Sequence, residues 1–229
     1  MVHDLILAAR ARFDHEGGDP PSPVPLPGDL ARAIVLPPAI TPHPRSLRSV
    51  ITSRRSTSLR GSDPLPLSHL AFLLRSADFP GSAPLCSEPG LRVQLFVVAL
   101  DVPPLEPAVY RYDQDHRLLP VAKLERERIR EEVLLQHDQG DAAALLFVVT
   151  PLAQWLRTHG DRGYRTAMLS VGWVIDSLYL RAEQLRLYYS ATGGFALARA
   201  NELLHLDGYE QTAALAFAVG TDPSATVES

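Results

Sequence analysis

Residues Met168 to Leu180 read MLSVGWVIDSLYL, and they lie inside a longer stretch, residues 163–186, that repeats apolar side chains at helical spacing. The residues that recur every three or four positions are Val171, Val174, Ile175, Leu178 and Leu185. Apolar residues nevertheless point in almost every direction around the helix axis between Met168 and Leu180. The pattern predicts a long helix that lies at the centre of the domain or is shared with a second subunit.

Asp176 is a carboxylate inside this apolar run. A buried carboxylate needs a hydrogen-bond or charge partner. Two interpretations follow, a structural hydrogen bond within the fold or a contact with a ligand or a second subunit.

The segments on either side predict an α+β domain. Strands are predicted in LRVQLFVVALD, in a pair PAVYRYDQDHRLLP bent at Asp113–Asp115, in AAALLFVVT up to Pro151, in LYYSAT and in TAALAFAVG. Helices are predicted in SLRSVITSRRS, in LSHLAFLLRSA with Ser68 as its cap, in the charged and solvated AKLERERIREEVLLQ, and in LARANELLHL. One α+β domain with helices around a mixed sheet fits this order.

Residues 1–44 differ in character from residues 45–229, which form the predicted domain. VHDLILAARARF predicts a short helix, and the chain from Asp14 to Pro44 is rich in proline. Because proline lacks an amide donor and restricts the residue before it, this part is expected to be an extended arm, partly of polyproline II type.

Composition excludes several classes of function. The chain has 229 residues, 46% of them hydrophobic, and a net charge of −4, which does not favour a nucleic-acid or membrane-surface protein. Its apolar runs are shorter than the about 18 residues that span a bilayer, and its amino terminus lacks the core of a signal peptide. Cys86 is the single cysteine, so no internal disulfide can form and a cytoplasmic location is expected.

Several common catalytic motifs are absent from the sequence. There is no Gly-x-Gly-x-x-Gly fingerprint, no phosphate loop ending in Gly-Lys-Ser/Thr and no Gly-x-Ser-x-Gly turn. The histidines show no metal-ligand spacing, so no metal site is expected. A Rossmann dehydrogenase, a serine hydrolase and a zinc enzyme are all disfavoured.

Two short motifs each allow a structural and a functional interpretation. SRRS, Ser53 to Ser56, places two arginines at a helix end, where cations suit the helix dipole, or forms a phosphate clamp of guanidinium and hydroxyl donors. ATGGF, Ala191 to Phe195, contains a turn that needs positive φ, or glycines that let the backbone approach a flat ring.

A third motif, THGDRGYR, begins at Thr158. Asp161 is the expected N-cap of the long helix, without the glutamate of a capping box. Arg162 and Arg165 stand where the helix dipole disfavours cations, which favours an anionic partner for them.

Taken in order, SRRST, VQLFVVALDV, PAVYRYDQDHRLLP, HGDRGYRTAMLSVGW, LYLRAEQLRL, ATGGF and LAFAVG resemble the SagB-type branch of the nitroreductase-like flavoproteins. That branch contains the azoline oxidases of thiazole- and oxazole-modified peptide pathways. The resemblance covers about residues 45–220. It implies a nitroreductase-like FMN-binding fold, an obligate homodimer, and flavin sites at the subunit interface.

The resemblance also implies roles for individual residues. Arg54, Arg55 and Ser56 match the motif that holds the FMN phosphate and ribityl chain, and Gly193 and Gly194 match the turn whose amide faces the flavin ring. Further flavin contacts fall on three residues that differ from the usual ones: Cys86 and Ser87, inside LCSEP where the family has Pro-Ser-Ala-Gly-Gly, and Asp176, where it has asparagine.

Two other departures bear on chemistry. Thr158 and His159 stand where the family has the Lys-Tyr pair implicated in proton abstraction from the azoline, and Thr221 stands where a basic residue often follows the last Val-Gly. An imidazole is a better base at neutral pH than a phenol. His159, with Thr158 beside it, is therefore the expected catalytic base.

These observations predict an FMN-dependent dehydrogenase that oxidises thiazoline or oxazoline rings in a ribosomally made peptide. Its expected partners are a second copy of the chain, cyclodehydratase proteins and the precursor peptide. Two alternatives stay open: a flavin-free family member that acts as a scaffold in the modifying complex, and an NAD(P)H-dependent reductase of small molecules.

Overall fold

The computed structural model describes residues 32–59, 62–77, 90–124 and 126–222. The strands are β1 (Ile34–Val35), β2 (Gln94–Ala99), β3 (Ala108–Tyr112), β4 (Arg117–Lys123), β5 (Ala144–Thr150), β6 (Leu187–Thr192) and β7 (Thr212–Thr221). The helices are α2 (Leu47–Ser53), α3 (Leu67–Ala77), α4 (Arg126–Arg128), α5 (Leu152–His159), α6 (Asp161–Gln184) and α7 (Leu197–Leu203). A π-helical turn η1 (Ile129–Val133) and a 3-10 turn η2 (His137–Asp141) follow α4.

The strands form one seven-stranded sheet in the order β1-β4-β3-β2-β5-β7-β6. The expected mixed sheet is antiparallel at every strand pair of the described residues. The predicted strands are confirmed, including the hairpin β3–β4 that turns at Asp113–Asp115. β6 is an edge strand, which leaves one of its sides available to other segments.

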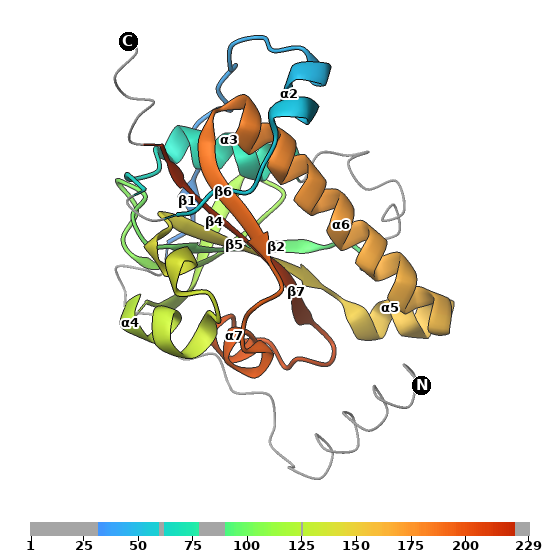
Figure 1. The fold of residues 1–229 in the computed structure, drawn as a ribbon. Helices are drawn as coiled ribbons and strands as arrows, with labels where there is room; N and C mark the ends of the chain where they lie inside the picture. The colour runs from blue at the N-terminus through green and yellow to red at the C-terminus, as the bar shows by residue number, and fades with distance from the viewer. Residues whose placement is uncertain (1–31, 60–61, 78–89, 125, 223–229) are drawn as a thin grey trace.

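The central strands are apolar on both faces because helices cover both faces of the sheet (Figure 1). On one face, Leu146 and Val148 of β5 pack in a core that includes residues of α3 and α6. On the other face, Leu145 and Phe147 of the same strand pack with residues of η1 and α7. The alternation of side chains along β5 therefore divides the interior into two layers.

The long helix is present as α6, 24 residues from Asp161 to Gln184. Asp161 is its first residue and not its N-cap, because the cap position is Gly160 with φ 58°. A preceding helix, α5, was not predicted. Gly163 lets the two helices approach closely, since a Cβ there would lie 2.1 Å from the carbonyl oxygen of Trp155.

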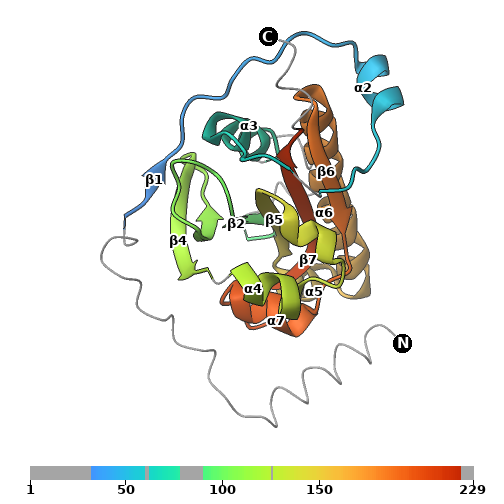
Figure 2. The same cartoon turned by 60° about the vertical axis from the view of Figure 1, so that its left-hand side comes forward.

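The described part of the proline-rich arm is extended, as expected, but it also joins the sheet. Ile34 and Val35 pair with β4, and Leu36 is buried in the core. From β1 the arm runs along the outside of the molecule to α2 (Figure 2). The helix predicted near the amino terminus lies outside the described residues.

Two details of the predicted helices were wrong. Ser68 lies inside α3, which begins at Leu67, so it is not the cap. The charged segment predicted as one solvated helix forms the short α4 and η1, in which Ile129 and Val133 are buried against the sheet. Burial of these two apolar side chains stabilises the segment against the sheet, whereas its charged side chains remain in solvent.

Candidate functional site

The motif SRRS lies where α2 ends. The hydroxyl of Ser46 accepts a bond from the Ser49 amide at 3.1 Å and so caps the start of the helix, which ends at Ser53. Arg54 is the C-cap, and Arg54, Arg55 and Ser56 are all exposed. Neither guanidinium has an ion pair within the described part of the chain. The segment therefore presents two uncompensated cations and a hydroxyl.

Tyr179 of α6 holds this segment from one side. The guanidinium of Arg54 lies 4.9 Å from the centre of the Tyr179 ring, close enough for a cation–π contact. The Tyr179 hydroxyl lies 3.2 Å from the Ser56 hydroxyl and accepts a bond from the Ala191 amide at 3.0 Å. One tyrosine thus joins the basic motif, α6 and β6.

The next residue, Thr57, fastens the segment to the edge strand. Its amide donates to the Tyr189 carbonyl at 2.9 Å, and its hydroxyl accepts from the Tyr189 amide at 2.7 Å. The basic motif consequently lies along the open side of β6, although it is more than 120 residues away in the chain.

The glycines of ATGGF follow the end of the same strand. Gly193 is two residues beyond Ala191, so it lies within about 7 Å of the strand residue that Tyr179 holds. The expected need for positive φ was wrong, because neither Gly193 nor Gly194 has it. A Cβ at Gly193 would meet only Leu215, at 3.6 Å, so neither backbone nor packing requires glycine there.

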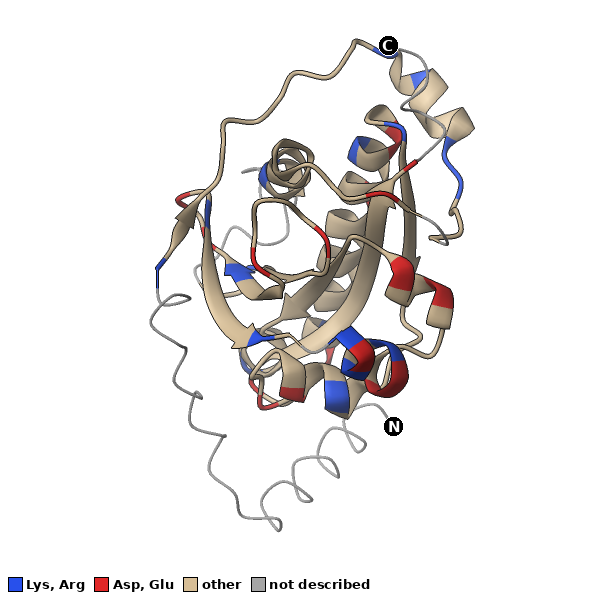
Figure 3. Cartoon of the chain, turned by 90° about the vertical axis from the view of Figure 1, so that its left-hand side faces the viewer, with Lys and Arg blue, Asp and Glu red and all other residues tan. Residues whose placement is uncertain are grey.

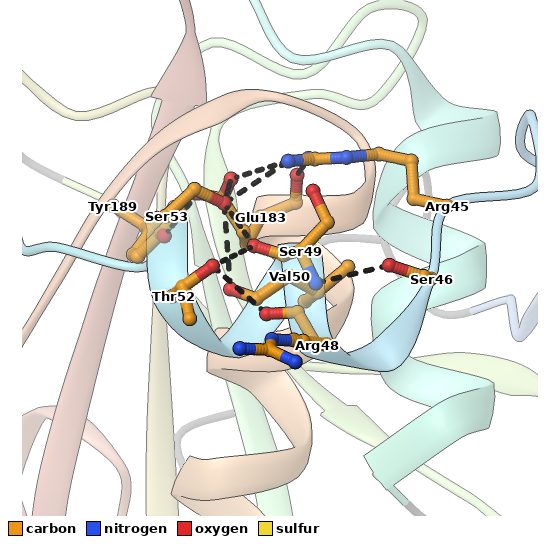
Figure 4. A network of polar contacts seen from close by, with 9 residues as sticks. All are labelled: Arg45, Ser46, Arg48, Ser49, Val50, Thr52, Ser53, Glu183 and Tyr189. Carbon is orange, nitrogen blue, oxygen red and sulfur yellow. Dashed lines mark hydrogen bonds and ion pairs between the residues drawn. The ribbon is translucent and has the colours of Figure 1, made fainter.

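Glu183, one turn after Tyr179 on α6, is the centre of a polar network (Figure 4). Its carboxylate accepts bonds from Arg45 at 3.1 Å, from Ser53 at 2.6 Å and from the Tyr189 hydroxyl at 2.7 Å, and Arg45 also donates to its carbonyl oxygen. Burial opposes ionisation of this group, but the three hydrogen bonds hold the pKa of Glu183 below its usual 4.5. Burial and the adjacent carboxylate raise the pKa of Tyr189, which therefore remains a donor.

Asp176 precedes Tyr179 by three residues, and its side chain is exposed. Because water can solvate this carboxylate, Asp176 does not need the partner within one chain that a buried carboxylate would require. Asp176 shares its side of the helix with Leu169 and Trp173, which are 58% and 49% exposed. The predicted apolar surface of the long helix thus has a buried side and an uncovered stripe.

Thr158 and His159 are the last residues of α5 and not part of a loop. The His159 imidazole is exposed and lies 5.4 Å from the Trp155 ring, centre to centre. At 1.5 Å per residue, about 27 Å of α6 separate its start at Asp161 from Tyr179. Thr158 and His159 thus lie at the opposite end of α6 from the basic motif.

A cavity of about 330 Å³ lies between α5 and the segment that follows the glycines. Its lining includes Leu152 and Leu156 of α5, Tyr164 and Met168 of α6, and Leu197 of α7. His159 follows Leu156 by three residues on the same helix, so the two side chains are neighbours. Ala213 and Ala214 of β7 also line the cavity, next to Leu215, the residue that a Cβ at Gly193 would meet. Neither glycine of the turn lines it, and neither does His159.

Other predicted site residues fall elsewhere. Cys86 and Ser87 lie outside the described residues. The Thr221 hydroxyl donates to the Pro64 carbonyl at 2.9 Å, and its backbone pairs with Asp63, so this residue closes the end of β7.

The described residues contain neither a cluster of metal ligands nor a membrane-spanning helix. No group of three or more potential metal ligands occurs among them. None of their helices is long and apolar enough to cross a bilayer.

On α4, η1 and α7 positive and negative side chains alternate and pair, as in Arg128 with Glu132 and Glu202 (Figure 3).

The nitroreductase family model matches residues 51–221, well over half of the chain, including the basic motif, α6 and the glycine turn. The chain belongs to the nitroreductase family. This nitroreductase-family protein is 27% identical over 172 residues to a Methanocaldococcus jannaschii protein that is named for the same family. The alignment covers 71% of this chain and 86% of that relative.

Several solved structures share the fold of this chain. A structure from Anabaena variabilis, 25% identical, matches with a TM-score of 0.67 over 76% of this chain, but this chain spans only 38% of its length. A chain of the E. coli microcin synthetase McbBCD complex, solved with truncated pro-MccB17, matches with a TM-score of 0.64 over 96% of this chain and 94% of that one, at 16% identity. An oxidoreductase containing FMN matches with a TM-score of 0.53 at 19% identity, over 83% of each chain. These comparisons confirm the predicted nitroreductase fold.

Sequence reasoning missed the residues that hold the site together. Tyr179 was counted as part of an apolar helix surface, and Glu183 and Arg45 were not singled out. Tyr179 and Glu183 are four residues apart on one helix, a spacing that puts both side chains on one side. A tyrosine and a glutamate at this spacing, next to a predicted basic motif, could have indicated them.

Proposed function

We propose that this nitroreductase-family protein binds FMN along β6 and oxidises thiazoline or oxazoline rings of a ribosomally made peptide. The observation that carries the proposal is the meeting of the basic motif and the glycine turn on one edge strand. Arg54, Arg55 and Ser56 supply donors for a phosphate. Gly193 leaves the backbone open to a flat ring.

The peptide substrate is supported by the resemblance to azoline oxidases and by the likeness of fold to a chain of the microcin synthetase complex. On this proposal the partners are cyclodehydratase proteins and a precursor peptide. The cavity lined by Leu156, Leu197 and Ala214 would hold the ring between a flavin that lies along β6 and the end of α5.

Oxidation of an azoline to an azole removes two hydrogens from the ring. One leaves Cα as a proton, and the other leaves the neighbouring carbon with its electron pair. FMN, when bound, supplies the acceptor for that hydride, and an oxidant such as dioxygen takes up the electrons afterwards. The chain's own task is to orient the ring and to accept the Cα proton, which we assign to the imidazole of His159 with Thr158 beside it.

The test is the absorption spectrum of the purified protein. A yellow protein with a flavin spectrum, whose flavin is released as FMN on denaturation, supports the proposal. Colourless protein that takes up no added FMN contradicts the proposal and favours the scaffold. The contacts of Thr221, which are purely structural, agree with that alternative too. Rapid bleaching of the flavin by NADPH would instead favour the small-molecule reductase.

We propose further that the protein is a homodimer that pairs through the exposed stripe of α6. Trp173→Glu should shift the mass in light scattering from twice the 25.1 kDa chain mass to the single mass. Two copies would each lose burial of a large side chain, about 1.5–3 kcal/mol apiece, and would gain a buried charge. Val35→Glu changes a residue that is 73% exposed, against 49% for Trp173, at the other edge of the sheet, and this variant should stay dimeric. A wild-type monomer that retains FMN would rule out the dimer.

Gly193→Ala should weaken FMN binding by about tenfold, the scale of one lost hydrogen bond, because the methyl group would hold the flavin ring away from the backbone. It should cause no loss of thermal stability. The added methyl has room in the protein, and alanine in place of glycine restricts the unfolded chain. Fluorescence titration with FMN and a melting curve measure the two effects. Unchanged affinity would mean that the flavin does not approach this turn.

A further inference from the structure

We propose that Glu183 is a positioning residue for the flavin phosphate, because it holds α2 in the place from which Arg54 and Arg55 reach the ligand. The inference rests on the proposed function and assigns a role to a carboxylate that would not itself touch FMN. It is carried by the three elements that converge on this side chain (Figure 4).

The helix α2 cannot hold its own position. It has seven residues, and Val50 is its only buried one. A helix this short is marginal without tertiary contacts. Its place on the protein therefore depends on the bonds made by its ends.

Glu183 accepts such a bond at the carboxyl end of α2, where the basic motif begins. Ser53, the last residue of α2, donates to the Glu183 carboxylate at 2.6 Å, and Arg54 follows it directly. The same carboxylate receives Arg45 from the segment before α2 and Tyr189 from β6. Loss of this carboxylate would weaken the hold on both flanks of α2, although Arg45 would keep its bond to the carbonyl oxygen of Glu183.

Glu183 and Tyr179 contact neighbouring residues of the basic motif from the same helix, α6. Tyr179 contacts Arg54 and Ser56, and Glu183, four residues later, contacts Ser53. The last turns of α6 thus fix the chain just before and within the basic motif.

The network also preserves the charge of the site. A carboxylate near two arginines would ordinarily weaken their attraction for a phosphate. Here the negative charge of Glu183 is matched by Arg45, with 14% of the Glu183 side chain and 20% of the Arg45 side chain exposed. Arg54 and Arg55 consequently keep their positive charge for a ligand.

The test compares Glu183→Gln with the matched control Asp113→Asn. Asp113 is also a mostly buried carboxylate, 18% exposed and ion-paired with an arginine, but it lies at the β3–β4 turn. Glu183→Gln should raise the dissociation constant for FMN, measured by quenching of flavin fluorescence, by about tenfold. Asp113→Asn should leave that constant unchanged, even if both variants lose similar thermal stability.

A second measurement needs no flavin. Trypsin cuts after Arg54 and Arg55. The rate of cleavage at these two bonds in the flavin-free protein, followed by mass spectrometry, therefore reports how firmly the segment is held. The rate should rise severalfold in Glu183→Gln and remain at the wild-type value in Asp113→Asn. Tyr189→Phe removes one bond to Glu183 and keeps the buried ring. Its rate of cleavage should also rise, but by less than that of Glu183→Gln. This variant decides the question if Glu183→Gln fails to fold.

The outcomes separate the two proposals. Wild-type protein that binds no FMN overturns the proposed function, and the role of Glu183 falls with it. Wild-type protein that binds FMN, with Glu183→Gln or Tyr189→Phe binding it equally well and resisting trypsin equally well, overturns only the role of Glu183. A salt bridge that merely stabilises the fold would lower the melting temperature without changing either readout.

Discussion

Replacement of both arginines in Arg54→Ala/Arg55→Ala is expected to weaken FMN binding by at least about a hundredfold. Each charge-assisted bond to a phosphate contributes about 1.5–3 kcal/mol, so a single replacement should cost about tenfold and the pair about the product. Both side chains are exposed at the end of α2, so their loss should leave the fold intact. Equilibrium dialysis against FMN measures the effect, and a melting curve checks the fold.

The matched control removes the same charge elsewhere. Arg126→Ala/Arg130→Ala changes two arginines of α4 and η1, on the face of the sheet away from α6. It should retain wild-type affinity for FMN at the same ionic strength. If the two double variants lose affinity equally, the effect is a general one of net charge, and the basic motif is only a helix end.

Replacement of His159 in His159→Ala is expected to lower the rate of azoline oxidation in a single turnover by about a hundredfold or more, the usual scale for removal of a general base. The bound FMN and the dimer should be unaffected, because the imidazole is exposed at the end of α5 and lies against the Trp155 ring of its own helix. Stopped-flow bleaching of the flavin by an azoline peptide in the absence of oxygen measures the step.

Two variants define what the result means. His137→Ala replaces another exposed histidine, on η2, and should oxidise the peptide at the wild-type rate. Thr158→Ala removes a hydroxyl that lies 3.4 Å from the Gln154 amide, and a smaller loss of rate there would indicate that it supports the imidazole. A wild-type rate in His159→Ala would show that the base lies elsewhere and that THGDRGYR is a junction between two helices.

That junction shows what the residues could indicate and what they could not. Both glycines of the motif, Gly160 and Gly163, can be seen in the sequence, but the need for glycine arises only in the folded structure. Gly160 has a φ of 58° at the break between the helices, and Gly163 lies against the Trp155 carbonyl. LAQWLRTH places Leu152, Trp155 and Leu156 at helical spacing, but its eight residues are shorter than the window of about 11 residues in which a helical period can be recognised, so α5 was missed. Its one buried aromatic, Trp155, packs against α6, and that contact exists only after folding.

The sequence by itself determined the parts of the protein whose cause is local. Continuous apolar runs marked β2 and β5 because both faces of those strands are covered, and a period of three and four residues marked α6. The ordered motifs were enough to indicate the nitroreductase family, which the match over residues 51–221 confirms.

Only the tertiary structure decided the strand order, the antiparallel pairing of the described strands, and the meeting of the basic motif with the glycine turn. These features depend on contacts between segments far apart in the chain, as between Thr57 and Tyr189 or Ser53 and Glu183. Their energies come from hydrogen bonds and burial at distances that no local pattern of residues encodes. The roles of Tyr179 and Glu183 became visible for the same reason, since a side chain at the end of a helix acquires its partners only when other elements pack against it.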